Sequence, residues 1–214
     1  MGITGICLIL FLIVHCYVNA LIFMPDGYHK YEAAAHFLGT NPITRTAEIG
    51  LFVGIILHIV QGLMLTAQNK SKRPVSYGMY SGHKNSKWYS RSMGLLGTII
   101  LLFLILHLWH FWGPNRYQQL MTGQEKNLYW EMETIFQNPI VVLLYVLGCI
   151  SLAYHLLHGF WSAFQTLGMA TGKYTGIIRG VGTAFSIIVP LIFIAMPVSF
   201  YFGWLPPASS FTGH

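Results

Sequence analysis

Long apolar stretches without a charged residue alternate with short polar segments along the whole chain. No Asp, Glu, Lys or Arg occurs within residues 1–25, 49–69, 92–115, 134–172 and 180–214. A helix needs about 20 mostly apolar residues to cross the hydrocarbon core of a membrane, and each stretch is long enough to hold one. The pattern therefore predicts five transmembrane helices in one domain (1–214), at about 2–24, 46–67, 92–112, 139–163 and 180–202, with polar connections between them.

The composition supports a membrane protein. Of the 214 residues, 54% are hydrophobic and 8% are charged, and the mean hydropathy is +0.55. Soluble domains carry roughly 25% charged residues, so the chain has too few charges to cover a solvated surface. We therefore expect an all-α integral membrane protein with lipid around it and no nucleic-acid partner, and the composition excludes a disordered chain.

The formal net charge of +6 is unevenly divided between the two sides that five alternating spans define. The side of the N-terminus and of the connections at about 68–91 and 164–179 carries eight basic residues and no acidic one. The opposite side carries four basic and all six acidic residues. Because basic residues concentrate on the cytoplasmic side, we predict a cytoplasmic N-terminus and a C-terminus outside.

Six of the ten histidines lie in or at the end of predicted spans. Ionisable side chains inside a membrane are costly and usually mark a functional site. Counting residues from the span ends at 1.5 Å per residue places His15 and His107 in an outer layer. The same count places His58 and His155 in an inner layer.

Two histidines at one depth, from two helices, can supply both axial ligands of a haem iron. Two such layers indicate two haems, and because the chain has no C-x-x-C-H motif, neither would be attached through thioethers. A hydrogen bond to a neighbouring helix is the other interpretation of a buried histidine. His110 and His158, each three residues after a proposed ligand, are alternatives that could contact propionates, quinone or water.

Other residues near these layers allow two interpretations each. Gly62 and Gly159 follow His58 and His155 by four residues, on the same helix face, and either clear space for a porphyrin or serve ordinary helix packing. Arg91 and Arg179 either pair with inner-haem propionates or anchor cytoplasmic helix ends. Glu48 either exchanges protons with a quinone or begins its helix favourably at the positive dipole end.

Four segments share sequence patterns with one family. They are GICLILFLIVHCYVN (5–19), AAAHFLGTNPITRTAEI (33–49), SRSMGLLGTIILLFLILHLWHFW (90–112) and LGCISLAYHLLHGFWS (147–162). Together and in this order, they make the chain resemble the cytochrome b membrane-anchor subunit of succinate:quinone oxidoreductases, in the class with one polypeptide, five spans and two haems. The resemblance covers essentially the whole chain and implies a haem-binding bundle of the first four helices, with the fifth helix peripheral.

The resemblance also implies residue roles. His15 and His107 would ligate the outer haem b, and His58 and His155 the inner haem b, in preference to His110 and His158. His158 and the two arginines would be candidate propionate contacts. The quinone, often menaquinone in this class, would react near the outer haem, where Glu48 and His36 are candidates by position.

The resemblance further implies partners. A flavoprotein with FAD and an iron–sulfur subunit would dock on the cytoplasmic face of a bacterial inner membrane, and the chain would carry electrons between them and quinone without itself oxidising succinate. The complex would belong to the respiratory chain and the tricarboxylic acid cycle, or work in reverse as a fumarate reductase. One alternative is the dihaem cytochrome b of another membrane dehydrogenase or transmembrane reductase. The other is a haem-free transporter that uses histidines. Transporters tend to contain internal repeats, and this sequence has none.

Overall fold

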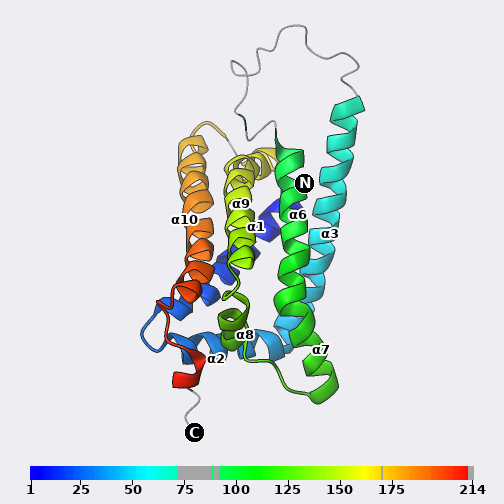
Figure 1. Ribbon diagram of the computed structural model, residues 1–214. Helices are drawn as coiled ribbons and strands as arrows, with labels where there is room; N and C mark the ends of the chain where they lie inside the picture. Colours follow the sequence, from blue (N-terminus) through cyan, green and yellow to red (C-terminus); the bar gives the residue numbers. More distant parts are fainter. Residues whose placement is uncertain (72–87, 89–91, 170, 212–214) are drawn as a thin grey trace.

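The computed structural model describes residues 1–71, 88, 92–169 and 171–211, and these fold into five long helices joined by shorter ones (Figure 1). The long helices are α1 (Gly2–Ala20), α3 (Pro42–Ser71), α6 (Met93–His107), α9 (Pro139–Thr166) and α10 (Thr175–Tyr201). The segments that are long and apolar enough to cross a membrane are Gly2–Phe23, Pro42–Asn69, Met93–Thr122, Pro139–Thr166 and Thr175–Tyr201. These findings confirm the predicted all-helical fold with five apolar membrane helices.

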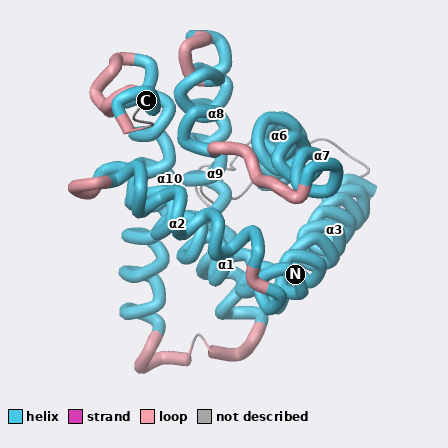
Figure 2. The backbone as a smooth tube through the Cα atoms, turned by 90° about the horizontal axis from the view of Figure 1, so that it is seen from below, coloured by secondary structure: helices cyan, strands magenta, loops and turns pink. Residues whose placement is uncertain are grey.

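The long helices form a bundle in which α1 and α9 hold the central contacts. Helix α9 packs against α10, α6 and α1, and α1 also packs against α3 and α10. Seen along the bundle, α10 and α3 lie on opposite sides (Figure 2). Helix α10 continues through Pro190 and Pro197 without interruption.

The long helices alternate in direction along the bundle (Figure 1). The two ends of the bundle carry different charged residues. One end holds α2 (Gly27–Thr40), α7 (Gly113–Thr122) and α8 (Leu128–Ile135). We call it the acidic end, because the acidic residues lie in or beside these helices or at the start of α3: Asp26, Glu32, Glu48, Glu125, Glu131 and Glu133. The opposite end, where the N-terminus lies, is called the basic end.

Asparagine caps explain where two of the helices begin. Asn138 precedes α9, its side-chain oxygen accepts a hydrogen bond from the Ile140 backbone N–H at 2.9 Å, and Pro139 follows as the first helical residue. Asn127 caps α8 in the same way through the Trp130 N–H at 2.8 Å. A capping side chain satisfies a backbone donor that has no partner within the helix, and proline is well tolerated at the first position.

The third long helix continues beyond its predicted end at residue 112. Helix α6 passes into a π-helical turn, η2 (Leu108–Trp112), and then into α7, which ends at Thr122. In this turn the Gly113 N–H bonds to the Leu108 carbonyl, five residues back. Pro114 lacks an N–H and cannot bond four residues back, which explains why the helix widens here, directly after His107.

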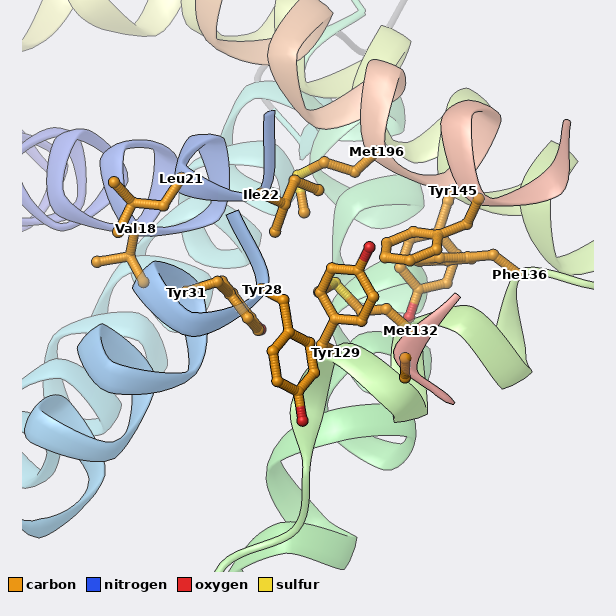
Figure 3. Close-up of a cluster of buried hydrophobic side chains, with 12 residues drawn as sticks. Val18, Leu21, Ile22, Tyr28, Tyr31, Tyr129, Met132, Phe136, Tyr145 and Met196 are labelled. Atoms are coloured by element: carbon orange, nitrogen blue, oxygen red, sulfur yellow. The ribbon is translucent and has the colours of Figure 1, made fainter. Parts of the chain in front are cut away.

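The acidic end is a packed structure, although its sequence predicted only polar connections at about 25–45 and 113–138. After α1, the short helix η1 (Leu21–Phe23) leads to α2, and η3 (Ala208–Ser210) follows α10. Tyr129, only 1% exposed, lies within a cluster of buried side chains at this end (Figure 3). Its hydroxyl donates to the Pro206 carbonyl at 2.7 Å. The hydrophobic side chains of these short helices therefore build a core across the end of the bundle.

Candidate metal centres

Two pairs of histidines face each other inside the bundle, and both are the pairs predicted from depth. His15 on α1 and His107 on α6 have ring centroids 5.9 Å apart, with an interplanar angle of 84°. We call them the acidic-end pair. His58 on α3 and His155 on α9 form the basic-end pair, with centroids 6.3 Å apart at 68°. Each of the four helices α1, α3, α6 and α9 therefore contributes one imidazole.

The two pairs lie at different levels of the bundle. His58 contacts Thr4 on α1, and its Nδ1 is 3.2 Å from the Thr4 hydroxyl. His15 lies eleven residues further along the same helix, a rise of about 16 Å at 1.5 Å per residue. The pairs are therefore separated along the bundle axis, as two layers.

The ring nitrogens of the two pairs have few hydrogen-bond partners. Nδ1 of His107 and Nδ1 of His155 are buried and have no hydrogen-bond partner among the residues that the structure describes. The His15 Nδ1 lies 3.4 Å from the Asn19 amide nitrogen, which donates to the His15 carbonyl at 2.7 Å. Buried polar atoms without partners are rare and costly, so these two nitrogens are unusual within the described part of the bundle.

The geometry fits a metal ion held by two imidazoles. Metal–imidazole bonds are about 2 Å long, so two rings on opposite sides of one ion have centroids about 6 Å apart, as both pairs do. Among the described residues, there is no group of three or more His, Cys, Asp or Glu side chains that could hold a metal ion by themselves. Haem iron needs only two axial ligands from the protein, so the donor set of each pair fits haem.

Aromatic rings surround the acidic-end pair. Phe11 stacks on His15 with centroids 5.2 Å apart, and Phe193 of α10 lies 5.3 Å from the same imidazole. Phe103 lies 5.8 Å and Phe111 5.4 Å from the His107 ring. Helix α10 thus contributes a ring to the surroundings of His15.

Glycines of two neighbouring helices lie beside the basic-end pair. A Cβ at Gly97 of α6 would lie 3.9 Å from Cε1 of His155, and a Cβ at Gly5 of α1 would lie 4.0 Å from Cε1 of His58. The sequence had pointed to Gly62 and Gly159, which lie on the histidines' own helices. A Cβ at either would also make only ordinary contacts, 3.7 Å from the Met1 side chain and 3.9 Å from His155 Cδ2. Gly5 and Gly97 escaped sequence reasoning because their proximity depends on how different helices pack.

The two alternative histidines have different surroundings. The His110 ring is stacked on Tyr145, with centroids 5.8 Å apart at 7°, and its Nδ1 is 2.9 Å from the Tyr145 hydroxyl. His158 is half-buried one turn beyond His155, and no hydrogen bond joins it to another residue in the described part of the chain. Among the described residues, neither one has a second imidazole beside its ring as the four paired histidines do.

The proposed propionate contacts are only partly described. Arg91 lies outside the described residues. Arg179 is exposed near the start of α10, and its guanidinium carbon lies 4.5 Å from the centre of the Trp161 ring. Stacking on an aromatic face is a common interaction of arginine, and here it joins α10 to α9 near the basic end.

The two quinone candidates lie at the acidic end but in separate interactions. Glu48 accepts a hydrogen bond from the Trp112 indole at 2.5 Å and pairs with Arg45 at 2.7 Å. His36 Nδ1 lies 2.7 Å from a carboxylate oxygen of Glu125. The His36–Glu125 contact borders a polar cavity of about 390 Å³ that Glu32 also lines. Burial raises the pKa of Glu32, against the hydrogen bonds from the Tyr129 and Leu128 backbone, which lower it.

Five apolar helices with a facing histidine pair at each of two levels define a class: multi-pass helical membrane proteins with two candidate metal centres in the bundle. Over 196 residues the chain is 30% identical to the succinate dehydrogenase cytochrome b558 subunit of Bacillus subtilis (strain 168), which covers 90% of this chain and 89% of that protein. The chain therefore belongs to the family of succinate dehydrogenase cytochrome b subunits. No family model and no solved structure matches it.

Proposed function

We propose that this chain is the dihaem membrane anchor of a succinate dehydrogenase or fumarate reductase and passes electrons between an iron–sulfur subunit and a membrane quinone. The observation that carries the proposal is the pairing of four histidines from four helices at two levels. The relative's name, a cytochrome b558 subunit of succinate dehydrogenase, supports both haem and the complex. In this proposal α1, α3, α6 and α9 form the haem-binding bundle, and α10 completes it from one side.

His15 and His107 would hold one haem b, and His58 and His155 the other. Iron with two imidazole ligands changes between the ferric and ferrous states and has no vacant position for oxygen, which suits electron transfer. The paired side chains supply the axial ligands, and the apolar helices around them exclude water. The facing imidazoles therefore give the bundle what it needs to hold redox centres at two depths.

The charge asymmetry orients the anchor. In this proposal the basic end faces the cytoplasm of a bacterium, as the positive-inside rule requires. A flavoprotein with FAD and an iron–sulfur subunit would dock at this end, close to the basic-end pair. Arg91, Arg179 and His158 lie toward the same end in sequence and would be the candidates for contacts with haem propionates.

The acidic end would then face outside and lie nearer the quinone. Menaquinone is our proposal for the quinone, with Glu48 and His36 as candidate residues. Both side chains contact polar partners. Glu48 contacts Arg45 and Trp112, and His36 contacts Glu125. Protons that accompany quinone chemistry need such polar groups at the membrane boundary.

The proposal is tested on the purified complex by comparing reduction with succinate and reduction with dithionite. We expect a b-type absorbance change with dithionite and a large part of the same change with succinate. A b-type signal that dithionite produces and succinate does not would assign the chain to another dehydrogenase or reductase. The absence of any haem signal would overturn the proposal.

A further inference from the structure

The Thr4 side chain bridges α1 to a histidine on α3. Its hydroxyl oxygen lies 3.2 Å from His58 Nδ1 and 3.1 Å from the Met1 backbone carbonyl. A hydroxyl group has one hydrogen to donate and two lone pairs to accept with. Since the Met1 carbonyl can only accept, the Thr4 hydroxyl donates to it and accepts a hydrogen bond from the His58 Nδ1–H.

This chain of two hydrogen bonds decides which nitrogen of His58 carries the proton. A neutral imidazole has one N–H and one free lone pair, and the partner of one nitrogen sets the state of the other. With the proton on Nδ1, the Nε2 lone pair of His58 is free to bind a metal. The hydrogen bond also fixes the orientation of the ring, because Thr4 is held on α1 by its own bond to Met1.

We propose that Thr4 is a positioning residue that holds His58 ready to ligate through Nε2 and lowers the redox potential of the basic-end centre. The inference rests on the proposed function, since it assigns a role toward the haem that the basic-end pair would hold. When a metal is bound through Nε2, a hydrogen-bond acceptor for the Nδ1–H makes the imidazole more basic. A more basic ligand favours the ferric over the ferrous state, so the midpoint potential falls.

The other three paired histidines lack an equivalent contact. The Asn19 amide nitrogen lies 3.4 Å from His15 Nδ1, and it is a donor that cannot accept from an N–H. Nδ1 of His107 and Nδ1 of His155 have no hydrogen-bond partner in the described part of the chain. Within the described residues, Thr4 is therefore the one hydroxyl that bonds a paired imidazole, and its effect is confined to the basic-end pair.

The test uses the purified complex with Thr4→Val, which is close to threonine in shape but has no hydroxyl, and Thr4→Ser, which keeps the hydroxyl. Optical redox titration and haem quantification are made on both. Thr98→Val is the matched control, because Thr98 is exposed on α6 and its hydroxyl donates to the Gly94 carbonyl of its own helix. Thr4→Ala is a second variant without the hydroxyl in case valine prevents assembly.

We expect Thr4→Val to raise the midpoint potential of the basic-end haem. The ratio of ferric to ferrous haem at a given potential should change about tenfold, which corresponds to 59 mV for a one-electron couple. The acidic-end haem, Thr4→Ser and Thr98→Val should keep the wild-type potentials. Selective loss of the basic-end haem from both hydroxyl-free variants, with Thr4→Ser intact, would equally support the inference.

Two results would overturn the inference while leaving the proposed function in place. One is an unchanged pair of potentials in Thr4→Val and Thr4→Ala with both haems bound. The other is a Thr4→Ser complex that behaves like Thr4→Val, since the hydroxyl would then not be the cause. A wild-type complex without haem would instead overturn the proposed function itself.

Discussion

The two histidine pairs have opposite surroundings within the same bundle. The acidic-end pair is enclosed by large rings, such as Phe11 beside His15 and Phe103 beside His107. The basic-end pair is bordered by Gly5 and Gly97, and one hydroxyl reaches it. Among the described residues, the only ring contact of His58 or His155 is the one between them. Two facing histidine pairs of similar geometry are therefore bordered in different ways, one by aromatic rings and the other by glycines of neighbouring helices.

The largest effect is expected from removing one imidazole of each pair. His107→Ala should remove the acidic-end haem and His155→Ala the basic-end haem, because a single remaining axial histidine leaves the iron half-ligated. Haem content per chain in the purified complex should fall from two to one in each variant. The two single variants also separate the absorbance of the two centres.

The matched controls are the neighbouring histidines of the same helices. His110→Ala and His158→Ala should both retain two haems, since His110 is bound to Tyr145 and neither faces a second imidazole. If His110→Ala lost a haem and His107→Ala kept both, the ligand assignment at the acidic end would be wrong.

The next effect concerns a glycine beside the basic-end pair. Gly97→Leu places a branched side chain where a Cβ alone would already lie 3.9 Å from His155 Cε1. We expect the basic-end haem to be lost or strongly reduced while the acidic-end haem stays, as measured by haem content. Gly180→Leu is the control, because a Cβ at Gly180 on α10 meets nothing within 4 Å. Equal loss of both haems in Gly97→Leu would show that the bundle, and not this site, was damaged.

The aromatic shell of the acidic-end pair predicts a smaller effect, on stability. Phe103 packs against His107 and also against Gly148, where a Cβ would lie 2.5 Å from the Phe103 ring. Phe103→Ala should leave a cavity that costs about 3 kcal/mol, so heating should release the acidic-end haem at a lower temperature than in wild type. Leu102→Ala, on the 63% exposed neighbour, should leave that temperature unchanged.

How much of this arrangement could be predicted depended on the kind of signal. The five helices and the pairs His15–His107 and His58–His155 followed from uncharged stretches and residue counts, because lipid imposes length and direction on each span. The short helices α2 and α8 escaped prediction, since their hydrophobic residues pack on one another at the end of the bundle. Thr4 and Gly97 also escaped, because contacts between helices depend on rotation about the helix axes, which a hydrophobic pattern leaves open.

The smallest predicted effect tests the polar region beyond the acidic-end pair. Burial raises the pKa of Glu32 in the folded protein, so the protonated form favours folding. Stability contributed by this group is therefore present at acidic pH and falls as pH rises from the ordinary pKa of a carboxyl to its raised value. Glu32→Gln should flatten this dependence in the pH range above the ordinary pKa of a carboxyl. Heating curves should show a change of roughly 2 °C or less, and a steeper pH dependence in the variant would contradict the expected sign.

The central claim is that each facing pair of histidines holds one haem b. The measurement that tests it most directly is the number of haem b groups per cytochrome chain in the purified wild-type complex, from a reduced-minus-oxidised spectrum with protein quantification. The account predicts two, both low-spin with two imidazole ligands. A complex with no haem, or with one haem that survives both His107→Ala and His155→Ala, would contradict it.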